Sequence, residues 1–281
     1  MDSEQAKLNA EQKQISTPFG TLALPNISVE TIIKQAITVP CVKIDRSSYL
    51  RTELSRFCQP DVVECAIVKN PAQAGISREQ IGKIADAAIA NENMKVTGIS
   101  ALSGIPGGLA MAATIPADLA QYFGFVLRIL QKLLYLYGFD ELEFDGTSLD
   151  DESITCLTVF LGAMFGVSEA TKGVSLIAKL VAEKTAKSLS RKALTKTAIY
   201  PIVKKIAQLA GVKMTKQIFA KSVAKIIPVL GALTSGSITF VSFLIGANRL
   251  KDVLSKQSLS DPNFYTIAIE NKEAEALIED S

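Results

Sequence analysis

Residues 96–117 read VTGISALSGIPGGLAMAATIPA and residues 226–248 read IIPVLGALTSGSITFVSFLIGAN, with no charged residue in either stretch. Each approaches the roughly 20 residues that a membrane-spanning helix needs. Both also contain Pro, several Gly and many small residues, which let helices approach closely in membranes and in protein cores alike. Three interpretations follow: buried helical hairpins of a soluble or peripheral domain, segments that insert reversibly or lie in the membrane interface, or permanent spans. The Pro and Gly content favours the first.

Helical periodicity dominates the rest of the chain. It predicts helices at 28–38, 46–57, 78–91, 115–138, 150–166, 171–198, 201–210, 214–226 and 233–256. Start signals support two of them: Ser77 precedes Glu79 and Gln80, and acids follow Ser148 in the first turn of another helix. Only residues 264–269 alternate like a strand, which would be isolated. The sequence therefore predicts an all-α helical bundle with two glycine-rich apolar hairpin segments.

The ends of the chain differ from this helical part. Residues 1–20 are polar and lack the apolar stretch of a secretory signal, so we expect a flexible N-terminal tail and a cytoplasmic protein. We expect the helical domain to cover residues 21–256 and an acidic tail to cover residues 257–281.

Composition excludes several kinds of chemistry. The chain has no His, which removes the commonest general base and the commonest zinc ligand. None of its four Cys forms a CxxC pair, so neither a zinc knuckle nor a redox motif is predicted. We expect no metal and no cofactor, and no catalytic residue can be named.

The net charge of +2 hides a strong segregation. Residues 172–225 hold 13 Lys or Arg and one acid, Glu183. Five of the basic residues fall on one half of a predicted helix: Lys184, Lys187, Arg191, Lys192 and Lys196. Such a basic amphipathic helix favours anionic lipid headgroups. The alternative is a solvated face packed on an acidic part of the same protein. Nucleic acid is not favoured, because the segment has only two aromatic residues for base stacking.

Asp118 and Arg128 are the only Asp/Arg pair in an apolar stretch. Ten residues apart on a helix, they lie on flanking faces. One hypothesis is a polar spot in an apolar cavity that orients a lipid headgroup or an ion. The other is that Arg128 forms a structural ion pair with a different residue, while Asp118 is a charge at the helix N-terminus.

Glycine and aromatic residues suggest two further features. Gly104, Gly107, Gly108 and Gly231 could cradle a phosphate, but no Walker or dinucleotide motif surrounds them, so tight helix packing or a turn is preferred. The aromatic residues at 135, 137 and 139 predict either a belt at a membrane interface or ordinary core packing.

Several of these motifs occur in an order that resembles the EcsC family of bacterial proteins. The matching stretches are Gly104–Gly108, Thr114–Leu119, Arg128, Tyr137–Asp140, Gly211–Lys216 and Ile227–Gly231. The resemblance covers roughly residues 77–256. It departs from the family at 235–239, where Asn with Gly and aromatic neighbours is common. It implies membrane association and an effect on export or envelope processes, and it brings no catalytic residues.

These observations together predict a peripheral protein at the inner face of the membrane, docked on anionic lipids through the basic segment. A membrane transporter or another protein is a further expected partner. Two alternatives are a lipid-binding or lipid-processing protein with an apolar cavity near Asp118, and an effector that inserts into membranes.

Overall fold

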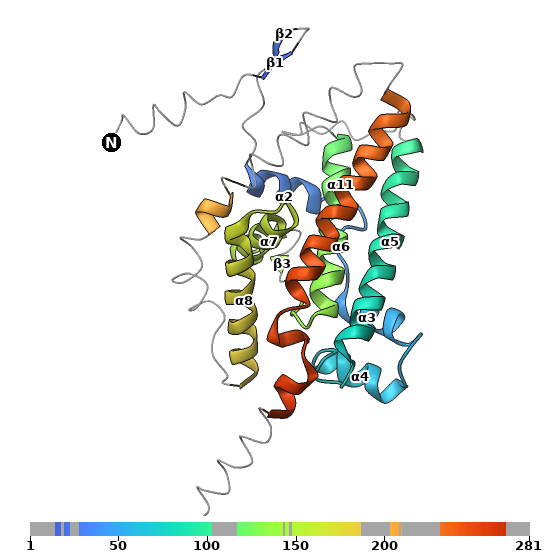
Figure 1. The fold of residues 1–281 in the computed structure, drawn as a ribbon, viewed down its shortest axis with the longest axis vertical. Helices are drawn as coiled ribbons and strands as arrows, with labels where there is room; N and C mark the ends of the chain where they lie inside the picture. Colours follow the sequence, from blue (N-terminus) through green and yellow to red (C-terminus); the bar gives the residue numbers. More distant parts are fainter. Residues whose placement is uncertain are drawn as a thin grey trace, which may run out of the picture.

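The computed structural model describes residues 15–17, 20–22, 28–102, 117–142, 144–145, 148–186, 203–207, 209 and 231–267. This part of the chain is mainly helical, which confirms the predicted all-α class (Figure 1). The longer helices are α2 (Val29–Ile37), α3 (Arg46–Leu54), α4 (Pro60–Val68), α5 (Arg78–Leu102), α6 (Ala117–Leu136), α7 (Asp151–Met164), α8 (Ser168–Ala186) and α11 (Gly231–Leu254).

The remaining elements are short. Two small antiparallel ribbons pair β1 (Ile15–Thr17) with β2 (Gly20–Leu22) and β3 (Phe144–Asp145) with β4 (Ser148–Leu149). A 3-10 turn, η1 (Ser258–Ser260), follows α11. Neither ribbon extends into a larger sheet among the described residues.

Side chains that accept from the first free backbone N–H groups explain where several helices begin. Ser28, Asp45 and Asp150 accept from the amide three residues on, at 3.0, 2.7 and 2.8 Å. Ser77 caps α5 in the same way, accepting from the Gln80 amide at 3.2 Å, as its sequence context predicts. Pro60 stands at the first turn of α4, where a missing N–H costs nothing.

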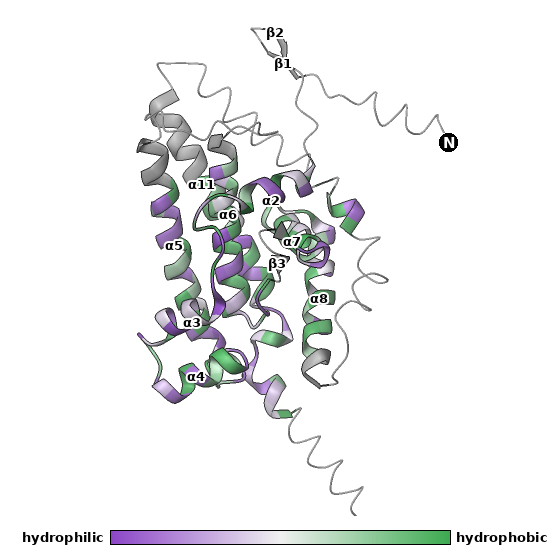
Figure 2. Cartoon of the chain, turned by 180° about the vertical axis from the view of Figure 1, so that it is seen from behind, coloured by the Kyte–Doolittle hydropathy of each residue, from purple (hydrophilic) through white to green (hydrophobic). Residues whose placement is uncertain are grey.

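α5, α6 and α11 form the centre of the molecule, and each of them contacts the other two. α7 and α8 pack together on the flank opposite α5, while α2 crosses α6 and α7 (Figures 1 and 2). α3 contacts α4 and α6. One continuous hydrophobic core joins these helices.

The aromatic residues at the end of α6 belong to this core. Tyr135, Tyr137 and Phe139 are at most 3% exposed, and the Phe139 ring packs edge-on against Phe160 at 5.2 Å. The prediction of an aromatic belt at a membrane interface is therefore wrong for these residues, and the prediction of core packing is confirmed.

The described parts of the two uncharged stretches lie in helices that converge at one end of the bundle. α5 ends there, and α6 and α11 begin there, at the top of Figure 1. Beyond Lys95 in α5, before Arg128 in α6 and before Arg249 in α11, the only charged residue in these helices is Asp118. The segments at 103–116 and 210–230, which include Gly104, Gly107 and Gly108, lie outside the described residues.

The structure also corrects one expectation near the C-terminus. Residues 264–267, the described part of the predicted strand at 264–269, are helical and not extended. Leu259, Ser260 and Tyr265 are buried, and the Tyr265 hydroxyl donates to the Leu259 carbonyl at 3.3 Å. The packed part of the chain therefore continues past residue 256, because these side chains complete the core beneath α11.

Candidate functional site

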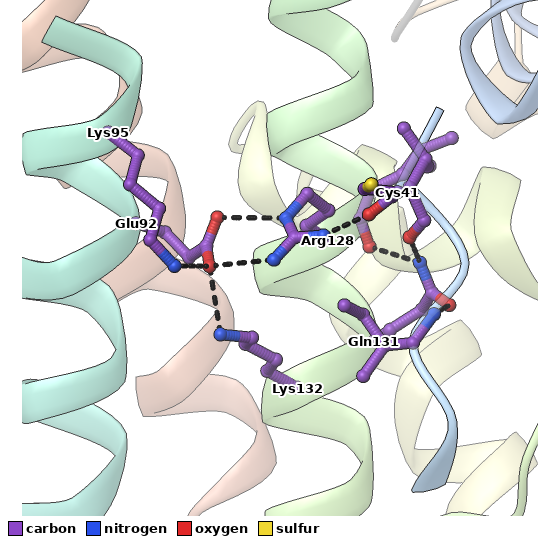
Figure 3. A network of polar contacts seen from close by, with 9 residues as sticks. Cys41, Glu92, Lys95, Arg128, Gln131 and Lys132 are labelled. Carbon is purple, nitrogen blue, oxygen red and sulfur yellow. Dashed lines mark hydrogen bonds and ion pairs between the residues drawn. The ribbon is translucent and has the colours of Figure 1, made fainter. Parts of the chain in front are cut away.

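A cluster of charges joins α5 to α6 in the middle of the bundle (Figure 3). The Glu92 side chain is fully buried. Its carboxylate accepts from Arg128 Nε at 3.1 Å, from Arg128 Nη2 at 3.3 Å and from Lys132 Nζ at 2.8 Å. Lys95, one turn further along α5, adds a third cation at 3.2 Å. One carboxylate is therefore shared by three cations.

The charges around Glu92 keep it ionised. Burial by itself raises the pKa of its carboxyl, but the hydrogen bonds from Arg128 and Lys132, together with their charges, outweigh burial and lower the pKa to about 2. A general acid or base works best with a pKa near the working pH. Glu92 is therefore suited to holding the two helices together and not to proton transfer near neutrality.

The cations of the cluster have second partners. Arg128 Nη1 donates to the carbonyl of Cys41, a residue held at a φ of 64° in the linker between α2 and α3. The Lys132 ammonium lies 5.2 Å from the centre of the Tyr49 ring, within the range of a cation–π interaction. The cluster therefore connects α5, α6, α3 and the linker.

Gln131 and Tyr135 hold the same linker from the next turns of α6. The Gln131 amide donates to the Val42 carbonyl at 2.9 Å and accepts from the Ile44 backbone N–H at 3.1 Å. The Tyr135 hydroxyl donates to the Ile44 carbonyl at 3.2 Å. The Gln131 amide thus satisfies one carbonyl and one N–H group of the linker backbone, as a neighbouring strand would.

Arg46 makes a second network at the far end of the bundle. Its guanidinium donates to carbonyls at the end of α4, Ile67 at 2.7 Å and Lys69 at 3.0 Å, and more weakly to Phe139 after α6. Burial lowers the pKa of Arg46, although nearby acids oppose this. These contacts satisfy carbonyls that a helix end leaves free, so Arg46 is a structural residue.

The predicted site residues fall in different places. Arg128 has Glu92 as its ion-pair partner, and Asp118 is the second residue of α6, with a side chain outside the described part. Lys184 lies in α8 and Gly231 begins α11. The other basic residues of the predicted lipid-binding face lie outside the described residues: Lys187, Arg191, Lys192 and Lys196.

Sequence reasoning missed Glu92 and Gln131. Glu92 lies between Asn91 and Asn93, a polar context that is typical of an exposed helix face. The feature of the sequence that could have revealed a buried acid is in α6, where Arg128 and Lys132 lie one turn apart in an apolar helix. Two buried cations require a buried anion, because an unpaired buried charge is expensive. The sequence alone does not say which helix supplies it.

A pocket lies between α6, the end of α7 and α11. It has a volume of about 180 Å³ and is lined by Tyr122, Val126, Met164, Phe165, Phe243, Ile245, Gly246 and Arg249. Most of the residues that line it are apolar, and Tyr122 and Arg249 bring polar groups to it. Tyr122 is one turn after Asp118, so this is the region where an apolar cavity was expected.

Comparisons with known proteins find no match: no family model, no curated protein and no solved structure is similar to this chain. Among the described residues, no helix is long and apolar enough to cross a membrane. The same residues hold no group of three or more acidic or Cys side chains placed to bind a metal ion.

Proposed function

We propose that this chain is a peripheral membrane protein that docks on anionic lipid at the inner face of the membrane. The observation that carries the proposal is the convergence of the charge-poor ends of α5, α6 and α11, in which Asp118 is the single charged residue, at one end of the bundle (Figure 1). Helix ends with few charged residues cost little to place in the lipid headgroup region, whereas each buried charge would cost several kcal/mol.

Exposed apolar side chains on α11 support this orientation. Val241 is 48% exposed and Ile245 is 44% exposed, and they are one turn apart on the same face. Burying the exposed half of such a side chain contributes about 1 kcal/mol. The charged cluster at Glu92 lies further down the bundle, so the charge-poor end is separate from this cluster.

The basic segment at 172–225 supplies the electrostatic part of the proposal. Each Lys or Arg near an anionic membrane contributes about 1 kcal/mol, so a segment with 13 of them would dominate the attraction at low salt. The ordered motifs that resemble the EcsC family support the same assignment and extend it to a role in export or envelope processes, with a transporter as a candidate partner.

Flotation with phospholipid vesicles tests the proposal. The full chain should float with vesicles that contain anionic lipid at about 0.1 M salt. It should be released at about 1 M salt, where the Debye length falls from about 10 Å to about 3 Å. Vesicles of neutral lipid should bind it weakly. Binding that ignores both lipid charge and salt would contradict the electrostatic part.

A pair of variants tests the orientation. Val241→Asn should weaken vesicle binding about fivefold, which corresponds to about 1 kcal/mol. Val68→Asn is the matched control, because Val68 is 80% exposed and ends α4 at the other end of the bundle (Figure 1). Equal binding by the two variants, both folded as judged by thermal melting, would contradict docking through the charge-poor end.

A further inference from the structure

The pocket between α6, α7 and α11 combines an apolar interior with a cation at its mouth. Val126, Met164 and Phe243 are at most 4% exposed and form the interior, while Ile245 and Arg249 are exposed and mark the opening. A pocket of mainly apolar walls with one placed polar group is the usual form of a small-molecule site.

Local packing places the Arg249 guanidinium. It lies against Gly166, in the turn after α7, where an added Cβ would come within 3.2 Å of Nη1. Gly166 has a φ of +69°, so a side chain there would also strain the backbone. The absence of a side chain at Gly166 therefore leaves room for the Arg249 guanidinium to pack beside the pocket.

Arg249 also has no acidic partner within the part of the chain that the structure describes. Two other cations on these helices do have acidic partners. Arg128 is paired with Glu92, and Lys251, two residues along α11 from Arg249, is paired with Asp86 at 2.5 Å. A cation held at the mouth of an apolar pocket without a carboxylate is complementary to a ligand that supplies one.

We propose that this pocket binds a medium-chain fatty carboxylate, with the alkyl chain in the apolar interior and the carboxylate on Arg249. A guanidinium offers two parallel N–H donors that match the two oxygens of a carboxylate. The pocket is smaller than the roughly 300–1,000 Å³ that encloses a drug-sized ligand, so it fits one short alkyl chain and not a two-chain lipid.

Titration calorimetry of the full chain with octanoate tests the proposal. Octanoate should bind, and each methylene added from butanoate upwards should strengthen binding about fourfold until the pocket is full. Octan-1-ol, which has the chain without the charge, should bind more weakly. The absence of octanoate binding to the folded chain would overturn the proposal.

Variants separate the cation from the pocket. Arg249→Gln should weaken octanoate binding about tenfold and leave octan-1-ol binding unchanged. Lys256→Gln removes a nearby exposed cation just after α11 and should bind octanoate like the unmodified chain. Octanoate binding that is equal in Arg249→Gln and the unmodified chain, or weakened equally by the Lys256 change, would overturn the role of Arg249.

A third variant tests the interior. Gly246→Ala adds a methyl group to the pocket wall, and its Cβ would stand in ordinary contact with Met164 at 3.4 Å or more, so the fold should persist. It should weaken octanoate and octan-1-ol binding in parallel, and unchanged binding of both would place the ligand elsewhere. Arg249→Gln should still float with anionic vesicles, so this proposal and membrane docking can fail independently.

Discussion

Glu92 is the residue at which charge and burial oppose each other most strongly. Glu92→Gln keeps the size of the side chain but leaves Arg128 and Lys132 without their counter-charge, at 17% and 8% side-chain exposure. Breaking a buried ion pair from one side typically costs about 3–5 kcal/mol. We expect the free energy of unfolding, measured with urea, to fall by about 3 kcal/mol.

The control for this change lies on the same helix. Glu79 pairs with Lys83 at 2.7 Å, but both side chains are more than 70% exposed. Glu79→Gln should therefore cost no more than about 0.5 kcal/mol. Equal losses in the two variants would contradict the role given to the buried cluster.

Acid provides a second measurement on Glu92. Its pKa in the folded chain, about 2, lies below the ordinary value of 4.5. Its contribution to stability is therefore complete above pH 4.5 and is lost as the pH falls from there towards 2, a loss of about 3 kcal/mol. The Glu92→Gln variant should lose stability less steeply in this window, and parallel curves would contradict the assignment.

At the scale of elements, α7 and α8 depend on two glycines for their close approach. An added Cβ at Gly162 would come within 2.4 Å of Ile206 Cγ2 and 3.1 Å of Ala170 Cβ, and one at Gly173 within 2.8 Å of Val159 Cγ1. Gly162→Ala should therefore cost about 1–3 kcal/mol in urea unfolding, because overpacking displaces these neighbours.

Gly82 in α5 is the matched control. An added Cβ there would meet nothing within 4 Å. Gly82→Ala should raise the free energy of unfolding by about 0.5–1 kcal/mol, because Ala is the better residue in a helix interior. A destabilising Gly82→Ala, or a neutral Gly162→Ala, would contradict the packing described for these helices.

Most long helices could be predicted from periodicity and capping, because these signals are local. α4 is absent from the predicted helices, although Pro60 stands at its first turn, where Pro marks a helix start. Residues 264–269 alternate over too short a span to separate strand from helix, and the contacts of buried Tyr265 with Leu259 and Asn70 favour the helix seen at 262–267.

The site was less predictable than the helices. Arg128 stood out in an apolar stretch, but its partner Glu92 lies 36 residues away in a polar run. The pocket at Arg249 depends on three helices that meet only after folding. Contacts of this kind depend on tertiary packing, which no local pattern encodes.

At the scale of the whole molecule, α11 joins the parts that these variants perturb. It contacts α5 and α6 on one side and α7 and α8 on the other. Glu92→Gln and Gly162→Ala should therefore lower the temperature of the same single calorimetric transition, by about 2–4 °C for each kcal/mol lost. Two transitions, each moved by only one variant, would indicate two separately folding units.

The linker between α2 and α3 is held by α6 in an unusual way. Arg128, Gln131 and Tyr135 all contact its backbone carbonyl or amide groups, and none of these contacts involves a linker side chain. A substitution at Cys41 would thus leave these hydrogen bonds in place, and a φ of 64° at position 41 favours Gly or Asn. The course of the linker is therefore written in the sequence of α6, since the hydrogen bonds that hold the linker depend on three side chains of that helix.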